Sequence, residues 1–145
     1  MLQIRQATRA DVDVCFAIRL AVRENVLSNP AAITHDHYVR EIELSGRGWV
    51  GQIDGAIRGF AVGRRTDGNI WALFVEPGFE GQGLGRALHD AMVAWLFAAG
   101  CTPLWLGTTP ATRAERFYRN AGWRVVGPAP GGEIRMELTE SRWRR

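Results

Sequence analysis

Residues 75–89 read Val75-Glu-Pro-Gly-Phe-Glu-Gly-Gln-Gly-Leu-Gly-Arg-Ala-Leu-His89 and place a glycine-rich loop between two regular elements of this 145-residue chain. The apolar run 70–75 before the loop predicts a strand, and the apolar spacing over 83–99 predicts a helix. Glycines at 81, 83 and 85 let the backbone approach a ligand closely. Because the first turn of a helix has unpaired N–H groups and the positive end of the dipole, the loop predicts an anion site suited to a pyrophosphate.

The sequence excludes two common nucleotide sites. A dinucleotide fingerprint, GxGxxG, needs a glycine at position 86 after those at 81 and 83, and this position is Arg86. All 18 basic residues are arginine, so the chain lacks the lysine of a P-loop. The absence of lysine also excludes Schiff-base catalysis. An anion at this loop must therefore be held by backbone amides and arginine, with Arg86 as the nearest candidate.

The rest of the pattern predicts one mixed α/β (α+β) domain over residues 1–145. Strands that follow one another in the middle of the chain predict antiparallel pairing, with Asp54-Gly55 as a hairpin turn. The strand–helix–strand order over 70–107 predicts a parallel crossover. We therefore expect a mostly antiparallel sheet of six to seven strands with about four helices on both faces. The expected strands begin at residue 2 and cover 48–53, 56–64, 70–75, 104–107, 123–126 and 133–138; the expected helices follow Thr8, cover 34–44 and 83–99, and precede Gly122.

Two starts are open for the last of these helices. Thr109 can act as its N-cap with Pro110 as the first helical residue. Alternatively, Thr112 and Glu115 can form a capping box one turn later.

The charge of the chain limits its partners. The formal net charge is +3 and the pI is about 9.5, values that would be compatible with nucleic-acid binding. However, acidic residues are interspersed throughout, and the one dense basic cluster is the tail Arg142, Arg144 and Arg145. On this distribution we do not expect a nucleic-acid partner.

Three further features predict whether the chain binds a metal or a membrane and in which compartment it acts: its cysteines, its histidines and the length of its apolar runs. Cys15 and Cys101 match no metal spacing and are expected as small buried side chains in a reducing cytoplasm. The polar run His35-Asp36-His37 is expected to open a helix rather than to bind a metal. The N-terminus lacks the apolar core of a signal peptide, and the apolar stretch 91–99 is about half the length of a membrane span. We therefore expect a cytoplasmic protein with no metal and no membrane partner.

Three segments carry a family resemblance that covers nearly the whole chain. The loop Glu80-Gly81-Gln82-Gly83-Leu84-Gly85 is similar to the Arg/Gln-x-x-Gly-x-Gly/Ala loop of the GNAT superfamily of N-acetyltransferases, except that Glu80 replaces Arg or Gln. Ile4-Arg5-Gln6-Ala7-Thr8-x-x-Asp11 resembles the first strand and helix of that family. Phe117-Tyr118-Arg119-Asn120-Ala121-Gly122-Trp123 resembles its Phe-Tyr-x-x-x-Gly-Phe signature. Because backbone amides make most of the contacts to the pyrophosphate in this family, we expect the Glu80 side chain to point away from it.

The resemblance implies a GNAT-type fold with acetyl-CoA as cosubstrate, bound in a cleft where the fourth and fifth strands splay apart. The backbone of Leu73, Phe74 and Val75 would pair with the pantetheine arm. Tyr118 corresponds to the tyrosine acid of the family, which would protonate the leaving thiolate. The pyrophosphate would lie on the loop and the first helical turn, which comprise Gly81, Gln82, Gly83, Leu84, Gly85 and Arg86.

Acetyl transfer to an amine requires the amine to be neutral. An amine with a pKa of about 10.4 is neutral in roughly one molecule in 2,500 at pH 7, and an α-amine near 8 in about one in ten. The glutamate that often serves as base in the family falls here at 69–71, where Asn, Ile and Trp do not titrate. Four residues near the first two helices remain as candidates: Glu24, His35, His37 and Glu41. Deprotonation relayed by ordered water is the alternative that the sequence favours.

Acceptor recognition is placed by the resemblance in residues 24–38 and 128–133. Glu24, Asp36 and Tyr38 are compatible with an amine cation, so a small-molecule amine or a free amino acid is the first interpretation. A peptide N-terminus and an aminoacyl-tRNA are the second and third. A non-catalytic module that binds CoA is a further alternative, favoured by Glu80 and by the missing base. Dimers are common in the family, so the sequence leaves a homodimer open.

Overall fold

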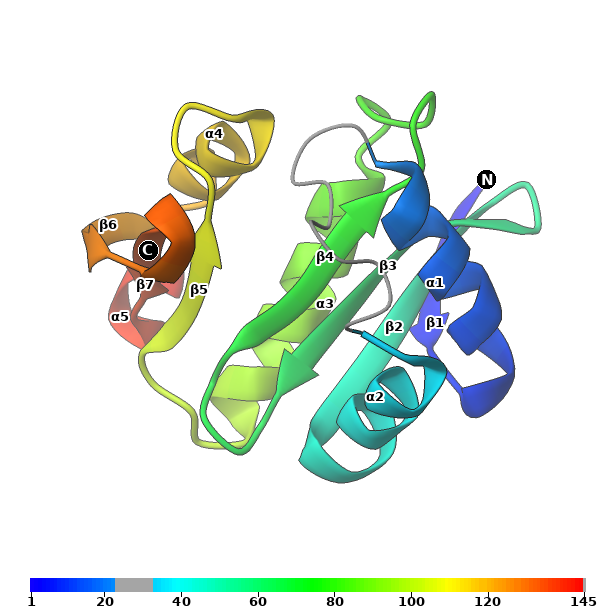
Figure 1. The fold of residues 1–145 in the computed structure, drawn as a ribbon, viewed down its shortest axis with the longest axis horizontal. Coiled ribbons are helices and arrows are strands. Elements are labelled where there is room, and N and C mark those ends of the chain that lie inside the picture. The colour runs from blue at the N-terminus through cyan, green and yellow to red at the C-terminus, as the bar shows by residue number, and fades with distance from the viewer. Residues whose placement is uncertain (23–32, 145) are drawn as a thin grey trace.

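The computed structural model describes residues 1–22 and 33–144 (Figure 1). Its larger sheet contains β1 (Leu2–Gln6), β2 (Gly46–Ile53), β3 (Ala56–Arg64) and β4 (Ile70–Val75), which are antiparallel and lie in that order. Asp54 and Gly55 connect β2 to β3 with φ values of 52° and 86°. Both residues thus adopt the left-handed conformation of a two-residue hairpin turn, as the Asp-Gly pair predicts.

The smaller sheet contains β5 (Leu104–Thr108), β7 (Ile134–Leu138) and β6 (Arg124–Pro128), in that order and antiparallel. The predicted mixed α/β fold with mostly antiparallel strands is confirmed, but the strands divide into sheets of four and three. The parallel crossover expected over 70–107 is reduced to one bridge, between Asn69 and Trp105. Beyond this bridge β4 and β5 diverge (Figure 1), so their C-terminal ends do not pair with each other.

Helices cover both faces of the larger sheet (Figure 1). α1 (Val12–Ala21) follows the 3₁₀ turn η1 (Arg9–Asp11) and lies with α2 (His35–Arg40) on one face, and α3 (Leu84–Ala98) lies on the other. The helix expected over 34–44 divides, because its second half is the π-helical segment η3 (Glu41–Ser45).

The later of the two candidate starts is the correct one for α4 (Arg113–Asn120). Thr112 is its N-cap, and the Thr112 hydroxyl accepts a hydrogen bond from the Glu115 backbone N–H at 3.3 Å. A start at Pro110 is excluded because Ala111 has a φ of 63°, which no right-handed helix accommodates. Two short elements near the C-terminus were not predicted, the 3₁₀ turn η4 (Pro130–Gly132) and α5 (Glu140–Trp143).

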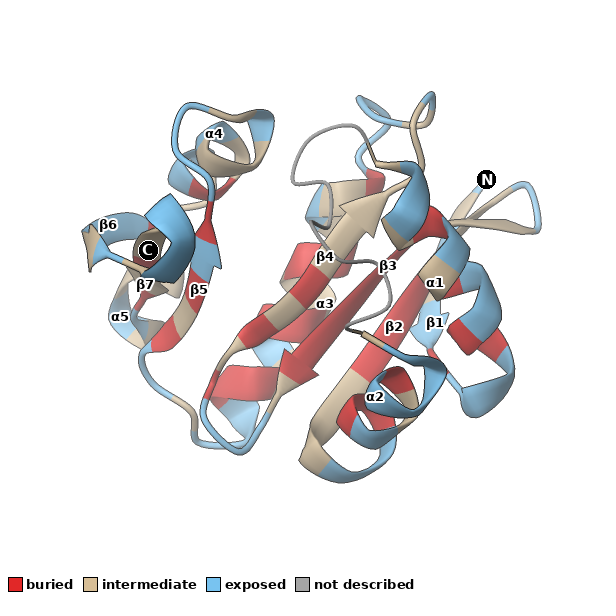
Figure 2. Ribbon diagram, viewed as in Figure 1, coloured by how far each residue is buried: buried red, intermediate tan, exposed pale blue. Residues whose placement is uncertain are grey.

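Two apolar clusters lie on opposite faces of the larger sheet, where Figure 2 shows the buried segments in red. The cluster under α3 continues into the smaller sheet, and α3 contributes to it the buried side chains Leu84, Leu88, Met92 and Leu96. The other cluster packs α1 and α2 against β3 and contains Cys15, which is buried as expected. Cys101 is only partly buried, because its thiol lies at a surface turn and donates to the Arg65 carbonyl at 3.2 Å.

Candidate active site

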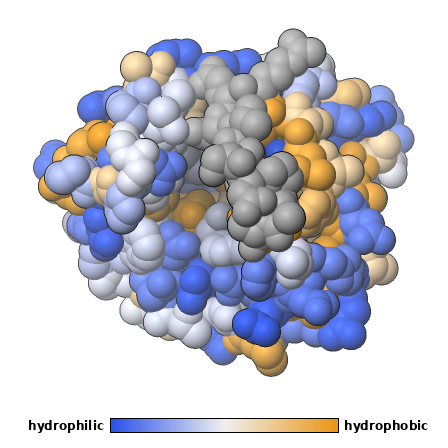
Figure 3. Space-filling model, viewed as in Figure 1, coloured by the Kyte–Doolittle hydropathy of each residue, from blue (hydrophilic) through white to orange (hydrophobic). Residues whose placement is uncertain are grey.

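A cavity of about 980 Å³ lies where β4 and β5 diverge. β4 forms one wall over its whole length, and the glycine loop, the C-terminal half of β5, α4, and side chains from α1 and α2 form the others. Because β4 is the edge strand of the larger sheet and the one bridge to β5 is at Asn69, no strand among the described residues pairs with its outer edge beyond that residue. Figure 3 shows apolar side chains at the bottom of a hollow on this side of the molecule, surrounded by a mostly polar surface.

The predicted cofactor-binding residues are largely brought together at this cavity. Leu73, Phe74, Val75, Gly81, Gly83, Gly85 and Arg86 line it. Gln82 is exposed outside the lining, and Leu84 turns into the core with 1 % of its surface exposed. Gly81 and Gly83 have φ values of 77° and 84°, and a Cβ built on either would meet nothing within 4 Å. Glycine is therefore required at these two positions by backbone conformation rather than by crowding.

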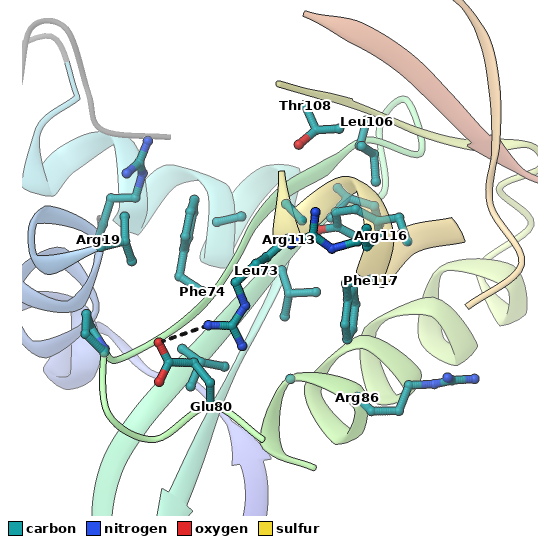
Figure 4. Close-up of a pocket in the computed structure, with 18 of the residues that line it drawn as sticks. Arg19, Leu73, Phe74, Glu80, Arg86, Leu106, Thr108, Arg113, Arg116 and Phe117 are labelled. Carbon is teal, nitrogen blue, oxygen red and sulfur yellow. Dashed lines mark ion pairs between the residues drawn. The ribbon is translucent and has the colours of Figure 1, made fainter. Parts of the chain in front are cut away.

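Glu80 does not point away from the loop, and this expectation was wrong. Its side chain lines the cavity, and one carboxylate oxygen accepts a hydrogen bond from the Gly78 N–H at 2.7 Å. The other oxygen lies 3.7 Å from Nη1 of Arg113, which reaches across from α4 (Figure 4). The Gly78 N–H and the Arg113 guanidinium thus hold the carboxylate at the glycine loop.

Arg86 lines the cavity, but its guanidinium is engaged elsewhere. Its Nε donates to Asp90 one helical turn later at 3.1 Å. In Figure 4 the Arg86 side chain extends along α3, away from the pair formed by Glu80 and Arg113. Of the two arginines, Arg113 is thus the one that the structure directs toward the loop.

Tyr118 lies on α4 and lines the cavity, although only 7 % of its surface is exposed. Its ring is packed among other rings, with centroid distances of 5.3 Å to Phe117 and 5.5 Å to Trp123. Burial raises the pKa of Tyr118, so its phenol keeps the proton at neutral pH. This tyrosine is therefore in the protonation state that a general acid needs.

Three of the base candidates from the sequence, His35, His37 and Glu41, lie in the described part of the chain, and none of them lines the cavity. His37 Nδ1 accepts a hydrogen bond from the Thr34 N–H at 3.0 Å at the start of α2. Glu41 lies 3.4 Å from Arg64, and His35 lies 3.6 Å from Asp13. Glu24 lies outside the described residues. The three described side chains thus take part in a helix cap and in ion pairs of α2 and η3, roles that the sequence could not distinguish from a catalytic placement.

Glu133 is a titratable residue of the cavity that was not among the base candidates from the sequence. It is half-buried, follows η4, and lines the cavity beside β5. A Cβ built on Gly107 would lie 2.9 Å from its Oε1, so the carboxylate rests over the bare backbone of β5. Within residues 1–22 and 33–144, its carboxylate forms no ion pair. The signal in the sequence was its position in the loop 128–133, which was assigned only to acceptor recognition.

The described lining carries more positive than negative charge. Arg19, Arg86, Arg113 and Arg116 line the cavity together with Glu80 and Glu133. Among the residues that the structure describes, no His, Cys, Asp and Glu side chains gather in a group of three or more that could hold a metal ion. The same residues include no helix with the length and apolar composition of a membrane span.

A profile of the acetyltransferase (GNAT) family matches residues 12–123, which include the glycine loop and Tyr118. The chain belongs to the GNAT family. Its fold is similar to that of PaiA N-acetyltransferase from Thermoplasma acidophilum, solved in complex with coenzyme A, with a TM-score of 0.80 and 14 % identity over 96 % of this chain and 99 % of that one. YncA from Salmonella typhimurium, solved with acetyl-CoA, has a TM-score of 0.75 and 20 % identity, with 96 % and 94 % covered.

Relatives by sequence cover less of this GNAT chain. An uncharacterized N-acetyltransferase of Mycobacterium tuberculosis is 33 % identical over 78 residues, which are 51 % of this chain and 50 % of that protein. The chain thus spans about half the length of the curated relatives it matches.

A buried histidine connects the two halves of this GNAT site. His89 has no exposed surface, and its Nε2 lies 2.9 Å from the indole Nε1 of Trp123. Because an indole N–H can only donate, Nε2 is the acceptor, which leaves the proton on Nδ1 for the bond to Asp90 at 2.8 Å. Asp90 also accepts from Arg86, so a continuous chain of hydrogen bonds runs from α3 to the rings around Tyr118.

We predict that His89 makes the stability of the protein depend on pH. Burial lowers the pKa of His89 in the folded state, whereas an unfolded histidine titrates near 6.5. Below that pH the unfolded state binds more protons, so the free energy of unfolding should fall with decreasing pH, by at most about 1.4 kcal/mol per pH unit. Denaturant titrations between neutral and mildly acidic pH measure this slope.

His89→Gln should flatten this dependence, and the matched control His35→Gln, on an exposed histidine, should leave it unchanged. Parallel pH profiles for wild type and His89→Gln would contradict the assignment.

Proposed function

We propose that this protein transfers the acetyl group of acetyl-CoA to a primary amine by direct attack, with Tyr118 as general acid. The observation that carries the proposal is that one cavity is lined by the glycine loop, the unpaired edge of β4 and Tyr118. A free strand edge offers N–H and C=O groups to an extended ligand, as the pantetheine arm would require. The glycines and the N-terminus of α3 supply an anion site for the pyrophosphate.

The reaction needs one group that donates a proton and one that accepts a proton, and in this proposal both are residues of the cavity. The amine nitrogen attacks the thioester carbonyl, the carbon–sulfur bond breaks, and the sulfur leaves with the bonding electron pair. Tyr118 gives its proton to that sulfur, whose thiol has a pKa of about 8.5 in water. Glu133 takes the proton that the amine loses, in place of the water relay that the sequence favoured.

Tyr118→Phe should lower kcat by about 10²- to 10⁴-fold, which is the usual contribution of a positioned acid. The ring and its packing remain, so the Kd for CoA should change little. Thiol release from acetyl-CoA with a panel of primary amines measures the rate, and calorimetry measures CoA binding.

An unchanged kcat in Tyr118→Phe would exclude Tyr118 as the acid. Thiol release that no amine stimulates, in a wild-type protein that binds CoA, would instead identify a non-catalytic module.

Glu133→Gln should have an effect that depends on the basicity of the acceptor. For an alkyl amine with a pKa of about 10.4, kcat/KM at pH 7 should fall roughly 100-fold. For an amino-acid amide, whose amine has a pKa of about 8, the loss should be below about tenfold, because one molecule in ten is already neutral. Equal losses for both acceptors would show that Glu133 positions the acceptor without taking its proton. CoA affinity serves as the control for folding.

Glu80→Gln should tighten CoA binding. The carboxylate repels the phosphates and pairs with Arg113, so its removal should gain about 1 kcal/mol, or roughly fivefold in Kd, at low salt. Arg113→Gln should weaken binding by a similar factor, and high salt should shrink both effects. The control is Glu76→Gln, since Glu76 pairs with Arg58 at 2.7 Å outside the cavity lining. Weaker CoA binding by Glu80→Gln would show that the carboxylate supports the loop and does not oppose the phosphates.

A further inference from the structure

The cavity extends beyond the glycine loop toward α1 and α2. Arg19 from α1 and Phe74 from β4 lie on one side in Figure 4, whereas Arg113, Arg116 and Phe117 from α4 lie on the other. Tyr38 from α2 and Trp71 from β4 line the same end as Arg19. This end combines aromatic rings with the guanidinium of Arg19, which lies away from the proposed path of CoA along β4, the loop and α3.

A β-bulge places Trp71 at this end of the cavity. Gly63 pairs with Ile70 and Val62 pairs with Ala72, so Trp71 is the extra residue of β4. Such a residue breaks the alternation of side chains, and Trp71 accordingly packs with Phe74 on the side of α1 and α2. Its ring meets that of Tyr38 edge-on, with centroids 4.9 Å apart.

The rings form an apolar wall that a ligand can contact. Tyr38 is 2 % exposed, and burial raises its pKa to about 12, so it is neutral and fixed in the core. Trp71 and Phe74 are half-buried and line the cavity. A wall of this kind suits an aromatic or large aliphatic group, because burial of apolar surface favours binding.

Arg19 adds a charge beside this wall. Its guanidinium carbon lies 4.4 Å from the centroid of Phe74, and burial lowers its pKa without removing its charge at neutral pH. A planar guanidinium in a partly dry site binds a carboxylate through two parallel hydrogen bonds. Figure 4 shows this side chain well apart from the loop that would hold the pyrophosphate.

We propose that the acceptor is a free α-amino acid with an aromatic or large aliphatic side chain, whose carboxylate is bound by Arg19 and whose side chain packs on Trp71 and Phe74. The proposal rests on the proposed acetyl transfer and adds the class of acceptor. A peptide N-terminus and an aminoacyl ester both present an α-amine without a free carboxylate beside it, so neither would use Arg19 in this way.

The test compares phenylalanine with two analogues that lack the carboxylate charge, phenylalaninamide and phenethylamine. Because each amine has its own basicity, the quantity compared is the effect of Arg19→Gln on kcat/KM for each compound. Arg19→Gln should lower kcat/KM for phenylalanine by about 10- to 150-fold, the range for a hydrogen bond between charged groups. The two analogues without a carboxylate should lose less than about threefold, and Arg19→Lys should restore part of the activity toward phenylalanine.

The control variant is Arg47→Gln. Arg47 also stacks on a ring, with its guanidinium carbon 4.9 Å from the centroid of Trp95, but it lies outside the cavity lining. It should leave all three rates unchanged, and CoA affinity checks the folding of every variant. Equal losses for the three compounds in Arg19→Gln would overturn the proposal in favour of a structural role on α1. A preference for phenylalaninamide that does not depend on Arg19 would overturn it in favour of a peptide or aminoacyl acceptor.

Calorimetry with phenylalanine and CoA-saturated protein separates this proposal from the proposed function. Binding that Arg19→Gln abolishes, without any acetyl transfer, would support the subsite while the proposed activity fails. Transfer to other amines, with no binding of phenylalanine, leucine or tryptophan, would leave the activity standing and overturn the subsite.

Discussion

The separation of β4 from β5 is the constraint on which the site depends. The two strands meet at Asn69 and Trp105, where the Asn69 side chain also donates to the Trp105 carbonyl at 3.3 Å, and then they diverge. A continuous sheet would have consumed the edge of β4 and filled the space now occupied by the cavity. Because the strands belong to separate sheets with α3 packed beneath both, the fold keeps a free strand edge without losing its core.

Because the chain has no lysine, the cationic side chains of the site are arginines. In the proposed complex, the phosphates of CoA would be bound by backbone N–H groups at Gly81 to Gly85 and by arginine, and the Arg113 side chain extends toward that loop (Figure 4). Glu80 pairs with this arginine and so offsets its positive charge beside the loop. Without lysine, the chain has no ε-amine that could itself be acetylated. The amine of Met1, just before β1, pairs with Asp54.

Local chemistry in the sequence predicted most of the architecture. Residues close together in the chain predict the Asp54-Gly55 turn, the glycine loop and the amphipathic α3. The Thr112 cap is also local, but choosing it over a start at Pro110 required the φ value of Ala111. The orientation of Glu80, the place of Glu133 over Gly107 and the bond from Trp123 to His89 could not be predicted, because each joins segments that only the tertiary fold brings together. The bulge at Trp71 could not be predicted either, because it depends on how the residues of β4 pair with those of β3.

The residues that the sequence predicted and those that only the structure placed at the cavity have different proposed roles. In the proposed reaction the loop and Tyr118, which the sequence predicted, would act on acetyl-CoA and the leaving thiolate, whose chemistry is the same for every acceptor. Arg19, Trp71 and Glu133, which needed the structure, line the parts of the cavity available to the acceptor, where the chemistry differs from one acceptor to another. A cation beside aromatic rings selects by charge and by apolar area at once, so the wall that α1, α2 and β4 build together is where acceptor specificity in this chain should be decided.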